Sequence, residues 1–234
     1  MRTKYLYLVL IVTLIVINLL FDSARKKMSI SLYEAVVPPA IQTMMAMDTC
    51  FERARKYFQE QGRDVSELVE CRVHPDMLPF HFQVVCIPHF SKSAIEAAKT
   101  GVIGGPNGAL GLDYDGLQDH LRMAIAYLES VDEAEFNALA GGEVVFHYPD
   151  NNINLPFRTQ DFFMSYAMPN FYFHCAMTYA LFRAEGVPIG VANWMGVVNS
   201  TPSINLPSDV VQQDGKSFLA HLEKLIEVSY RKVD

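Results

Sequence analysis

The residues best suited to chemistry are Asn170 and His174, which lie one helical turn apart in the string MPNFYFHCAMTYALFR, residues 168–183. A metal site in a helix bundle needs converging side chains from facing helices, commonly with two ligands at i and i+3 or i+4 of one helix. The chain has no His-x-x-x-His and no Glu-x-x-His pair, and asparagine is a far weaker ligand than imidazole for zinc or nickel. His174 is therefore open to three interpretations: a core histidine with a structural hydrogen bond, a ligand contact, or half of a divalent-metal site.

Three further residues have chemistry that depends on their surroundings. His89 follows Pro88, which should kink its helix, and a kink exposes backbone carbonyls and can open a cavity. Asp76, in the turn HPDMLP, is a candidate general acid or base, although an Asp between prolines commonly bonds local backbone and caps the next helix. Tyr172 could orient a ligand, although aromatic residues at this density on a helix usually pack in a core.

Other common chemistries lack support in the sequence. The glycine-rich stretch 102–116 has no Gly-Lys-Ser/Thr and does not predict a phosphate-binding loop. No Gly-x-Ser-x-Gly surrounds a serine, which speaks against an activated serine nucleophile. The absence of Cys-x-x-Cys favours buried free thiols over zinc sites or disulfides. We therefore expect no cofactor, with a divalent ion such as zinc, nickel or manganese at the histidines as the alternative. The cysteines are Cys50, Cys71, Cys86 and Cys175.

Apolar residues spaced by three and four predict four long helices, of which three come first. The first is expected to begin at Pro38-Pro39, and the second covers residues 80–101 with a kink at Pro88. The third follows the glycine-rich stretch. The apolar stripe of the first helix is Met44, Met47, Phe51, Ala54 and Phe58, and that of the third is Leu117, Leu121, Ala124 and Leu128.

A change of period marks a β-hairpin before the fourth helix. Residues 141–158 hold two β-rich runs around the turn-forming string PDNN. Thr159 is then expected to cap the fourth helix, with Asp161 near its positive end. The buried stripe of this helix is expected to be Phe163, Tyr166, Asn170, Phe173, Met177 and Leu181, with His174 at its border.

These elements predict an all-α domain over residues 28–196, a four-helix bundle with a small β-hairpin before its last helix. Residues 197–234 follow as a linker and a C-terminal amphipathic helix. Phe218, Leu222, Leu225 and Ser229 share one face of that helix. Docking on the bundle is expected rather than independent folding, because isolated helices of this length are marginal in water.

The first 27 residues are set apart as a predicted membrane anchor with a basic flank. Residues 5–21 are seventeen consecutive residues without a charge, at the low end of the roughly 17–25 that a spanning helix needs. A cleaved signal peptide is the rival interpretation, but the apolar run is longer than the roughly 7–15 residues of a signal core and the cleavage pattern is poor. Basic residues on both sides leave the orientation open. If synthesis starts at Met28, the domain is cytoplasmic.

The charge of the chain limits its partners. The net charge is −7, and it falls to −11 without residues 1–27, which hold five basic residues and one acid. Nucleic-acid binding needs clustered Lys and Arg to neutralise phosphates, and the short string RKK at residues 25–27 is better interpreted as a membrane flank. The expected partners are the membrane, through residues 5–21, and a small molecule. Association of the chain with itself is compatible with the sequence.

Four strings carry a resemblance to a known family. SISLYEAVVPPAI, HPDMLPFHFQV, PHFSKSA and MPNFYFHCAMTYALFRAEGVPIG are similar to the family named domain of unknown function 1993, over residues 28–196. That family resembles the DinB/YfiT-like four-helix bundles. The resemblance implies this fold and, for many of its members, a divalent metal held by three histidines.

The resemblance also assigns site positions in this chain. His89 would stand for the first ligand, on the second helix, and His174 for the last, on the fourth. Asn170 would occupy the remaining histidine position, and there the chain departs from the pattern. The resemblance therefore implies the fold more strongly than the metal.

Two functions follow as expectations. In the first, a membrane-tethered helical bundle acts as a binding or interaction module, with His89, Asn170 and His174 fixing core geometry or holding a small ligand. In the second, a divalent ion on His89 and His174 would activate water or a thiol in a transferase or hydrolase of the DinB-like kind. The two differ in whether a third donor approaches the histidines, because catalytic zinc sites use three protein ligands.

Overall fold

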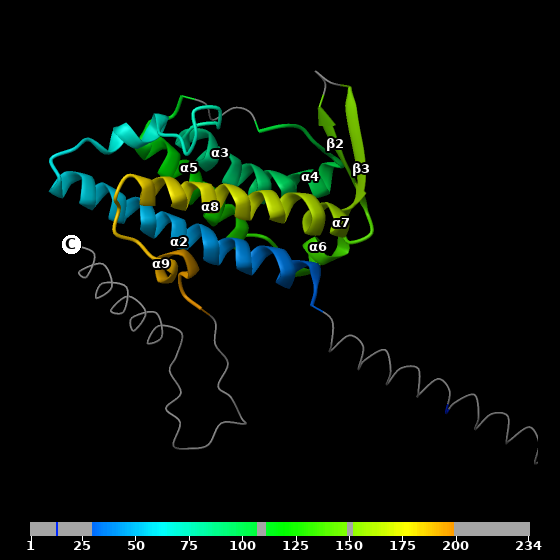
Figure 1. Cartoon of the computed structure of the whole chain (residues 1–234). Helices are drawn as coiled ribbons and strands as arrows, with labels where there is room; N and C mark the ends of the chain where they lie inside the picture. The colour runs from blue at the N-terminus through cyan, green and yellow to red at the C-terminus, as the bar shows by residue number, and fades with distance from the viewer. Residues whose placement is uncertain (1–12, 14–29, 107–110, 149–151, 199–234) are drawn as a thin grey trace, which may run out of the picture.

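The structure, a computed structural model, describes Thr13 and residues 30–106, 111–148 and 152–198. Apart from Thr13, the predicted anchor lies outside these residues, and so does the predicted C-terminal amphipathic helix. Among the helices that are described, none is both long and apolar enough to span a bilayer. Element labels follow Figure 1.

The first bundle helix, α2 (Leu32–Glu60), begins earlier than predicted. Ser31 caps it in a capping box with Glu34, which satisfies orphan backbone donors of the first turn. Pro38 and Pro39 consequently lie inside the helix, and the prediction that they start it was wrong. The helix continues through them because buried residues on both sides hold it to the core. The predicted stripe is confirmed, since Met44, Met47, Phe51, Ala54 and Phe58 are all fully buried.

In the second bundle helix, Pro88 lies where an α-helix changes to a π-helix. After the 3₁₀ helix η1 (Val65–Glu70), α3 (Phe80–Pro88) passes directly into η2 (His89–Ser93), a π-helix, and then α4 (Ala94–Thr100). Pro88 has no N–H to donate, and the backbone widens into the π turn directly after it. The hydroxyl of Ser91 donates to the carbonyl of Ile87 at 2.7 Å. Gly101 ends α4 with φ +84°, which only glycine adopts readily.

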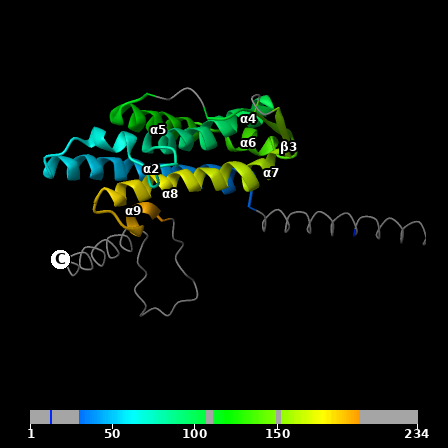
Figure 2. The same cartoon turned by 45° about the horizontal axis from the view of Figure 1, so that its top comes forward.

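The third and fourth bundle helices complete a ring of four. The third is α5 (Tyr114–Glu129), and the short α6 (Glu133–Ala138) follows it. The fourth is α8 (Met168–Ala184), which comes directly after α7 (Thr159–Phe162) and the π-helix η4 (Phe163–Ala167). Helix α2 contacts α5 and α8, and α3 contacts the same two. Figure 2 shows these helices running along one long axis. The four-helix arrangement was therefore predicted correctly.

The buried face of α8 differs from the predicted stripe. Phe173, predicted to be buried, is 50% exposed, whereas Phe171 and Cys175 are fully buried. The π turn of η4 adds one residue between Phe163 and α8, so the buried face moves by one position. Thr159 is the first residue of α7 rather than its cap, which is Arg158, so that prediction was also wrong.

The sheet has one strand more than the predicted hairpin. Strands β2 (Glu143–Tyr148) and β3 (Ile153–Arg158) pair antiparallel, as expected. In addition β1 (Val102–Ile103), inside the stretch taken for a glycine-rich loop, pairs parallel with β2. The described domain is therefore mostly helical with a small three-stranded sheet, not all-α. Two residues are too few to give an alternating pattern, which is why the sequence did not predict β1.

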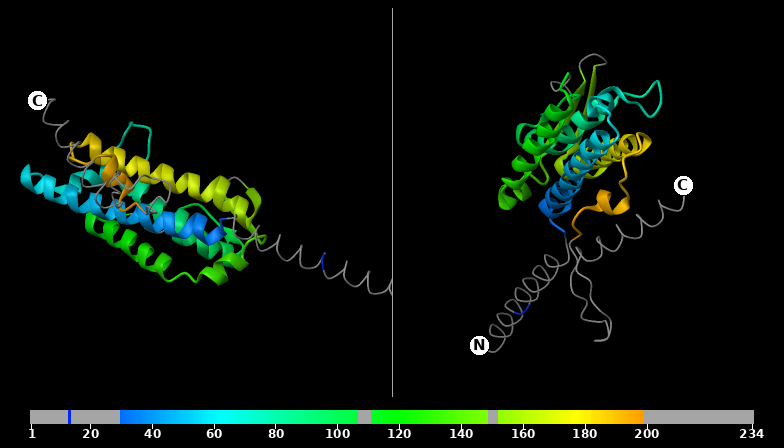
Figure 3. Two further views of the ribbon diagram at one scale, coloured as in Figure 1. Left: turned by 90° about the horizontal axis from the view of Figure 1, so that it is seen from below. Right: turned by 90° about the vertical axis from the view of Figure 1, so that its left-hand side faces the viewer.

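The last described element, α9 (Val191–Met195), packs against α2. Gln42 donates to the carbonyl of Met195 at 2.8 Å. Gly196 approaches α2 so closely that an added Cβ would lie 3.0 Å from the Cβ of Ala46. Figure 3 shows α9 and the β2–β3 hairpin on opposite sides of the bundle.

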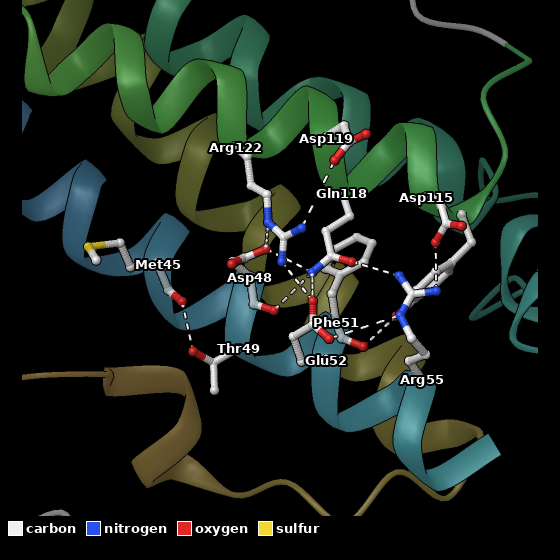
Figure 4. Close-up of polar contacts among 11 residues, drawn as sticks. Met45, Asp48, Thr49, Phe51, Glu52, Arg55, Asp115, Gln118, Asp119 and Arg122 are labelled. Carbon is white, nitrogen blue, oxygen red and sulfur yellow. Dashed lines mark hydrogen bonds and ion pairs between the residues drawn. The ribbon is translucent and has the colours of Figure 1, made fainter. Parts of the chain in front are cut away.

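Polar residues also join two of the bundle helices. Gln118 of α5, only 1% exposed, donates to Asp48 and Glu52 of α2 and accepts from Arg55. Arg122 donates to the same two carboxylates at 2.8 and 2.6 Å. Figure 4 shows this network between the facing sides of α2 and α5. It satisfies a buried amide and fixes the register of the two helices.

Candidate functional site

His174 is held in one tautomer by a residue on the neighbouring helix. It lies on α8, and its Nδ1 is 2.8 Å from Oε1 of Gln83 on α3. The Nε2 of Gln83 donates to the carbonyl of Leu78 at 2.8 Å, so the remaining amide atom, Oε1, is an acceptor. Nδ1 of His174 is therefore the donor, and its Nε2 carries the free lone pair when the ring is neutral. Nε2 has no hydrogen-bond partner among the described residues.

His89 is a second imidazole of which one ring nitrogen, Nε2, has no partner within the described ranges. It is the first residue of η2, and its side chain has a hydrogen-bond interaction with the backbone of Gly104, just after β1. Its Nε2 is buried and has no partner in the described part of the chain. Nδ1 is then the nitrogen that can donate to the Gly104 carbonyl, which leaves the lone pair on Nε2.

Both imidazoles are neutral at physiological pH. Burial lowers the pKa of His89 to about 4, against which the Gly104 contact acts weakly. Burial also lowers the pKa of His174 to about 4, and the positive charge of a protonated His89 lowers it further. The two rings lie near one another, because both contact the ring of Phe90. Each of the two rings therefore offers a hydrogen-bond acceptor at Nε2, and neither offers a donor there.

Aromatic rings enclose the pair. Phe90 lies parallel to His174 with ring centroids 5.5 Å apart and planes 5° apart, and it meets His89 edge-on at 4.8 Å. Tyr166 also meets Phe90 edge to face, with ring centroids 5.8 Å apart. The ring of Phe82 also lies near that of His174, with centroids 6.3 Å apart. These rings exclude water and make any unpaired polar atom costly.

Both site helices carry a π turn at the site. His89 begins η2, and η4 ends directly before α8, where His174 lies. Each π turn inserts one residue into a helix, and such turns recur at functional sites because they reorient a side chain at a helix face. The sequence predicted the kink at Pro88 but neither π turn.

Asn170 does not supply an obvious third ligand. Its amide nitrogen donates to the carbonyl of Tyr166 at 2.7 Å, within its own helix. Within residues 30–106, 111–148 and 152–198, no three His, Cys, Asp or Glu side chains lie close enough to hold a metal ion. Two imidazoles therefore do not match the three protein ligands of a catalytic zinc site.

The other two predicted residues lie apart from the histidine pair. Asp76 is exposed and contacts His74 in the loop before α3. It does not cap α3, whose N-cap is Pro79 without a side-chain bond. Tyr172 is 38% exposed on α8, and its ring packs on Phe171 at 5.2 Å. No contact joins either residue to His89 or His174.

A second feature, which the sequence did not predict, is a groove of about 890 Å³ along α2, between α5 and α9. We call it the α2–α5–α9 groove. Its floor is the outer side of α2, including Pro38, Ile41 and Met45. Helix α5 contributes Ile125, and the segment after α9 contributes Val197. Only the spacing of Pro38, Ile41 and Met45, opposite the buried stripe, could have indicated it. None of the elements that hold the histidine pair forms part of it.

Comparisons with known proteins agree with the fold. Residues 32–195 match the family model described as Domain of unknown function (DUF1993), which confirms the resemblance in the sequence. Among solved structures, the chain is similar to a DinB family member protein from Shewanella denitrificans, with a TM-score of 0.62 and 21% identity. The alignment covers 74% of this chain and 96% of that one. At this identity the likeness shows the fold alone. No curated protein matches the chain.

Proposed function

Because the chain belongs to the DUF1993 family and has a DinB-like fold, we propose that it is a membrane-tethered binding module. Its ligand is a small molecule or side chain with a cationic hydrogen-bond donor, which His89 and His174 accept between α3–η2 and α8. The tether is residues 5–21, whose seventeen uncharged residues support an anchor.

One observation carries the proposal: Nε2 of His89 is buried without a partner in the described residues. An unpaired buried polar atom costs about 1–3 kcal/mol, so native proteins rarely leave one without a reason. The cost is recovered when a bound group donates to this nitrogen.

The chemistry of the pair selects the kind of ligand. Nε2 of His174 is an acceptor, because Nδ1 of that ring donates to Oε1 of Gln83. The same role is assigned to Nε2 of His89, because this nitrogen has no partner in the described part of the chain while the ring interacts with the Gly104 backbone. An anion would find no donor there. An ammonium or guanidinium group would find an acceptor on each of the two rings. The acidic chain, with net charge −7, favours the same partners.

Titration by nitrogen-detected NMR tests the proposal on the full chain. Methylammonium and methylguanidinium should shift the Nε2 resonances of His89 and His174, and acetate should not. His89→Leu should abolish the response at His174, whereas His147→Leu, which removes a histidine from the hairpin, should leave it unchanged. A proton on either Nε2 at pH 7, or an equal response to acetate, would contradict the proposal.

A second candidate has its own support. Metal-binding histidines commonly donate their other N–H to a carbonyl or carboxylate, and His174 and His89 both have such an oxygen partner. His89 and His174 would hold a divalent ion, which would supply Lewis-acid chemistry of the DinB-like kind. The two-ligand donor set makes this the weaker candidate. Calorimetric titration with Zn²⁺, Ni²⁺ and Mn²⁺ decides between them, because binding that His174→Leu abolishes would favour the metal.

The anchor has a separate test. Expressed from Met1 in cells, the full chain should sediment with membranes and resist extraction by alkaline carbonate. Recovery of all the protein in the soluble fraction would remove the tether from the proposal and leave the histidine site intact.

A further inference from the structure

The described chain ends inside the α2–α5–α9 groove. Val197, 55% exposed, is part of the groove wall, and Gly196 just before it packs on Ala46 of α2. The last described residue, at position 198, directly follows this wall.

The groove has the shape and chemistry of a helix-binding site. Its floor follows α2 at spacings of three and four through Pro38, Ile41, Met45 and Thr49, which gives a straight track of about 17 Å at 1.5 Å per residue. Met45 on this floor is 53% exposed, so an apolar side chain faces water on a surface with walls on two sides. Amphipathic helices dock in such grooves through residues at i, i+3, i+4 and i+7.

The C-terminal sequence supplies a matching segment. Residues 217–229 place Phe218, Leu222, Leu225 and Ser229 on one face and Glu223 and Glu227 on the opposite one. Thirteen helical residues would span about 20 Å, close to the length of the groove floor.

From these observations we infer that residues 217–229 dock as a helix in the α2–α5–α9 groove of their own chain. The connection is the right length, because eighteen residues, 199–216, separate the groove wall from the segment, and a flexible linker of that length has an end-to-end distance of about 23 Å. Such a linker gives an effective concentration on the order of millimolar, so a weak contact suffices. The inference does not depend on the histidine site.

Cross-linking in the full chain tests the occupant directly. In a Cys71→Ser background, Met45→Cys is combined in turn with cysteine at Phe218, Leu222 or Leu225, and treated with a short bis-maleimide. At least one of these pairs should give an intramolecular product, and the outward pairs with Glu223→Cys and Glu227→Cys should not. Covalent dimers would assign the groove to a second copy, and no product from any apolar-face pair would overturn the inference.

Hydrogen–deuterium exchange of the same full chain gives an independent readout. Amides of residues 218–229 should exchange at least ten times more slowly than those of residues 199–216. Met45→Lys should remove this protection, whereas Met123→Lys should keep it, because Met123 is an exposed methionine of α5 that does not line the groove. Protection that needs added lipid vesicles would assign the segment to a membrane surface and overturn the inference.

Discussion

Nδ1 of His174 lies 2.8 Å from Oε1 of Gln83, a residue 91 positions away in the sequence. The contact crosses from α8 to α3 and fixes which nitrogen of the imidazole faces the site. Burial keeps the ring neutral, and the amide oxygen of Gln83 adds no negative charge that would favour the imidazolium.

Gln83→Glu should therefore raise the pKa of His174. A carboxylate within hydrogen-bond distance favours the charged imidazolium, commonly by about 1–3 pH units, from the present value of about 4. An NMR titration of the His174 ring proton measures the change. Gln160→Glu, at a half-buried position near the hairpin, should leave it unaltered. An unchanged His174 pKa in Gln83→Glu would show that the contact is absent in solution.

The stability of the domain should fall as the pH decreases from about 6.5 to 4. His89 and His174 have pKa values of about 4 when folded, against 6.5 for an ordinary histidine, so the unfolded chain binds more protons in this range. Their contribution is complete above the unfolded pKa and is lost toward the folded one, with a slope of at most about 1.4 kcal/mol per pH unit for each ring. Urea unfolding at several pH values measures it.

The control for this pH dependence is the loss of one ring. His89→Leu should reduce the slope between pH 4 and 6.5, and His147→Leu should not. Equal slopes in all three proteins would mean that the two buried rings do not titrate as their burial indicates.

Asn170→His should increase the affinity of the site for Zn²⁺ at least tenfold. The substitution places a third imidazole one turn before His174 and gives the helix the His-x-x-x-His spacing of a bundle metal site. Calorimetric titration measures the gain. Phe173→His, which adds an imidazole on the exposed side of the same helix, is the matched control and should bring no gain. Equal affinities for Asn170→His and the unaltered protein would show that position 170 does not face the pair.

Gly186→Ala should destabilise the domain more than Gly62→Ala. Both glycines have positive φ, +88° and +65°, so both substitutions cost about 1–2 kcal/mol of backbone strain. Only at Gly186 does an added Cβ meet another atom closely, the hydroxyl oxygen of Tyr57 at 2.7 Å. Chemical denaturation of the two variants compares them, and Tyr57→Phe combined with Gly186→Ala should recover part of the difference.

Gln118→Leu should reduce the free energy of unfolding by about 1–3 kcal/mol, because it leaves Asp48, Glu52 and Arg55 each without one partner. Thermal and urea unfolding measure this loss. Gln61→Leu, at the exposed end of α2, is the control and should change stability little. A neutral Gln118→Leu would mean that Arg122 alone satisfies the two carboxylates.

The fold could be predicted from the sequence where one apolar stripe repeats without interruption. This holds for α2, whose stripe from Met44 to Phe58 is buried as expected. The prediction failed where a local irregularity changes the period, as η4 does before α8, so that Phe173 was placed on the wrong face. It failed at Pro38 too, since the capping box of Ser31 determines the start of α2.

The candidate site was predictable only in part, and for a different reason. His174 was singled out by its spacing from Asn170 and His89 by its place after Pro88, and their roles in a site stay a prediction. The sequence did not predict the roles of Gln83 and Gly104. Each interacts with a histidine that is distant in the sequence, and such contacts produce no repeating pattern in a single sequence. The α2–α5–α9 groove was missed for the same reason, since its walls come from three separate segments.

Because of the two π turns, the position of the site residues is sensitive to the deletion of a single residue. Each π turn is one inserted residue, and Tyr166 of η4 packs on Phe90, the ring that contacts both imidazoles. Deletion of a single codon among residues 163–167 would convert the π turn to an α turn and rotate α8 by about 100°. His174 would leave the face that it shares with His89, while the composition of the bundle would hardly change. One in-frame deletion could thus separate a lineage that keeps this pair from one that keeps only the fold.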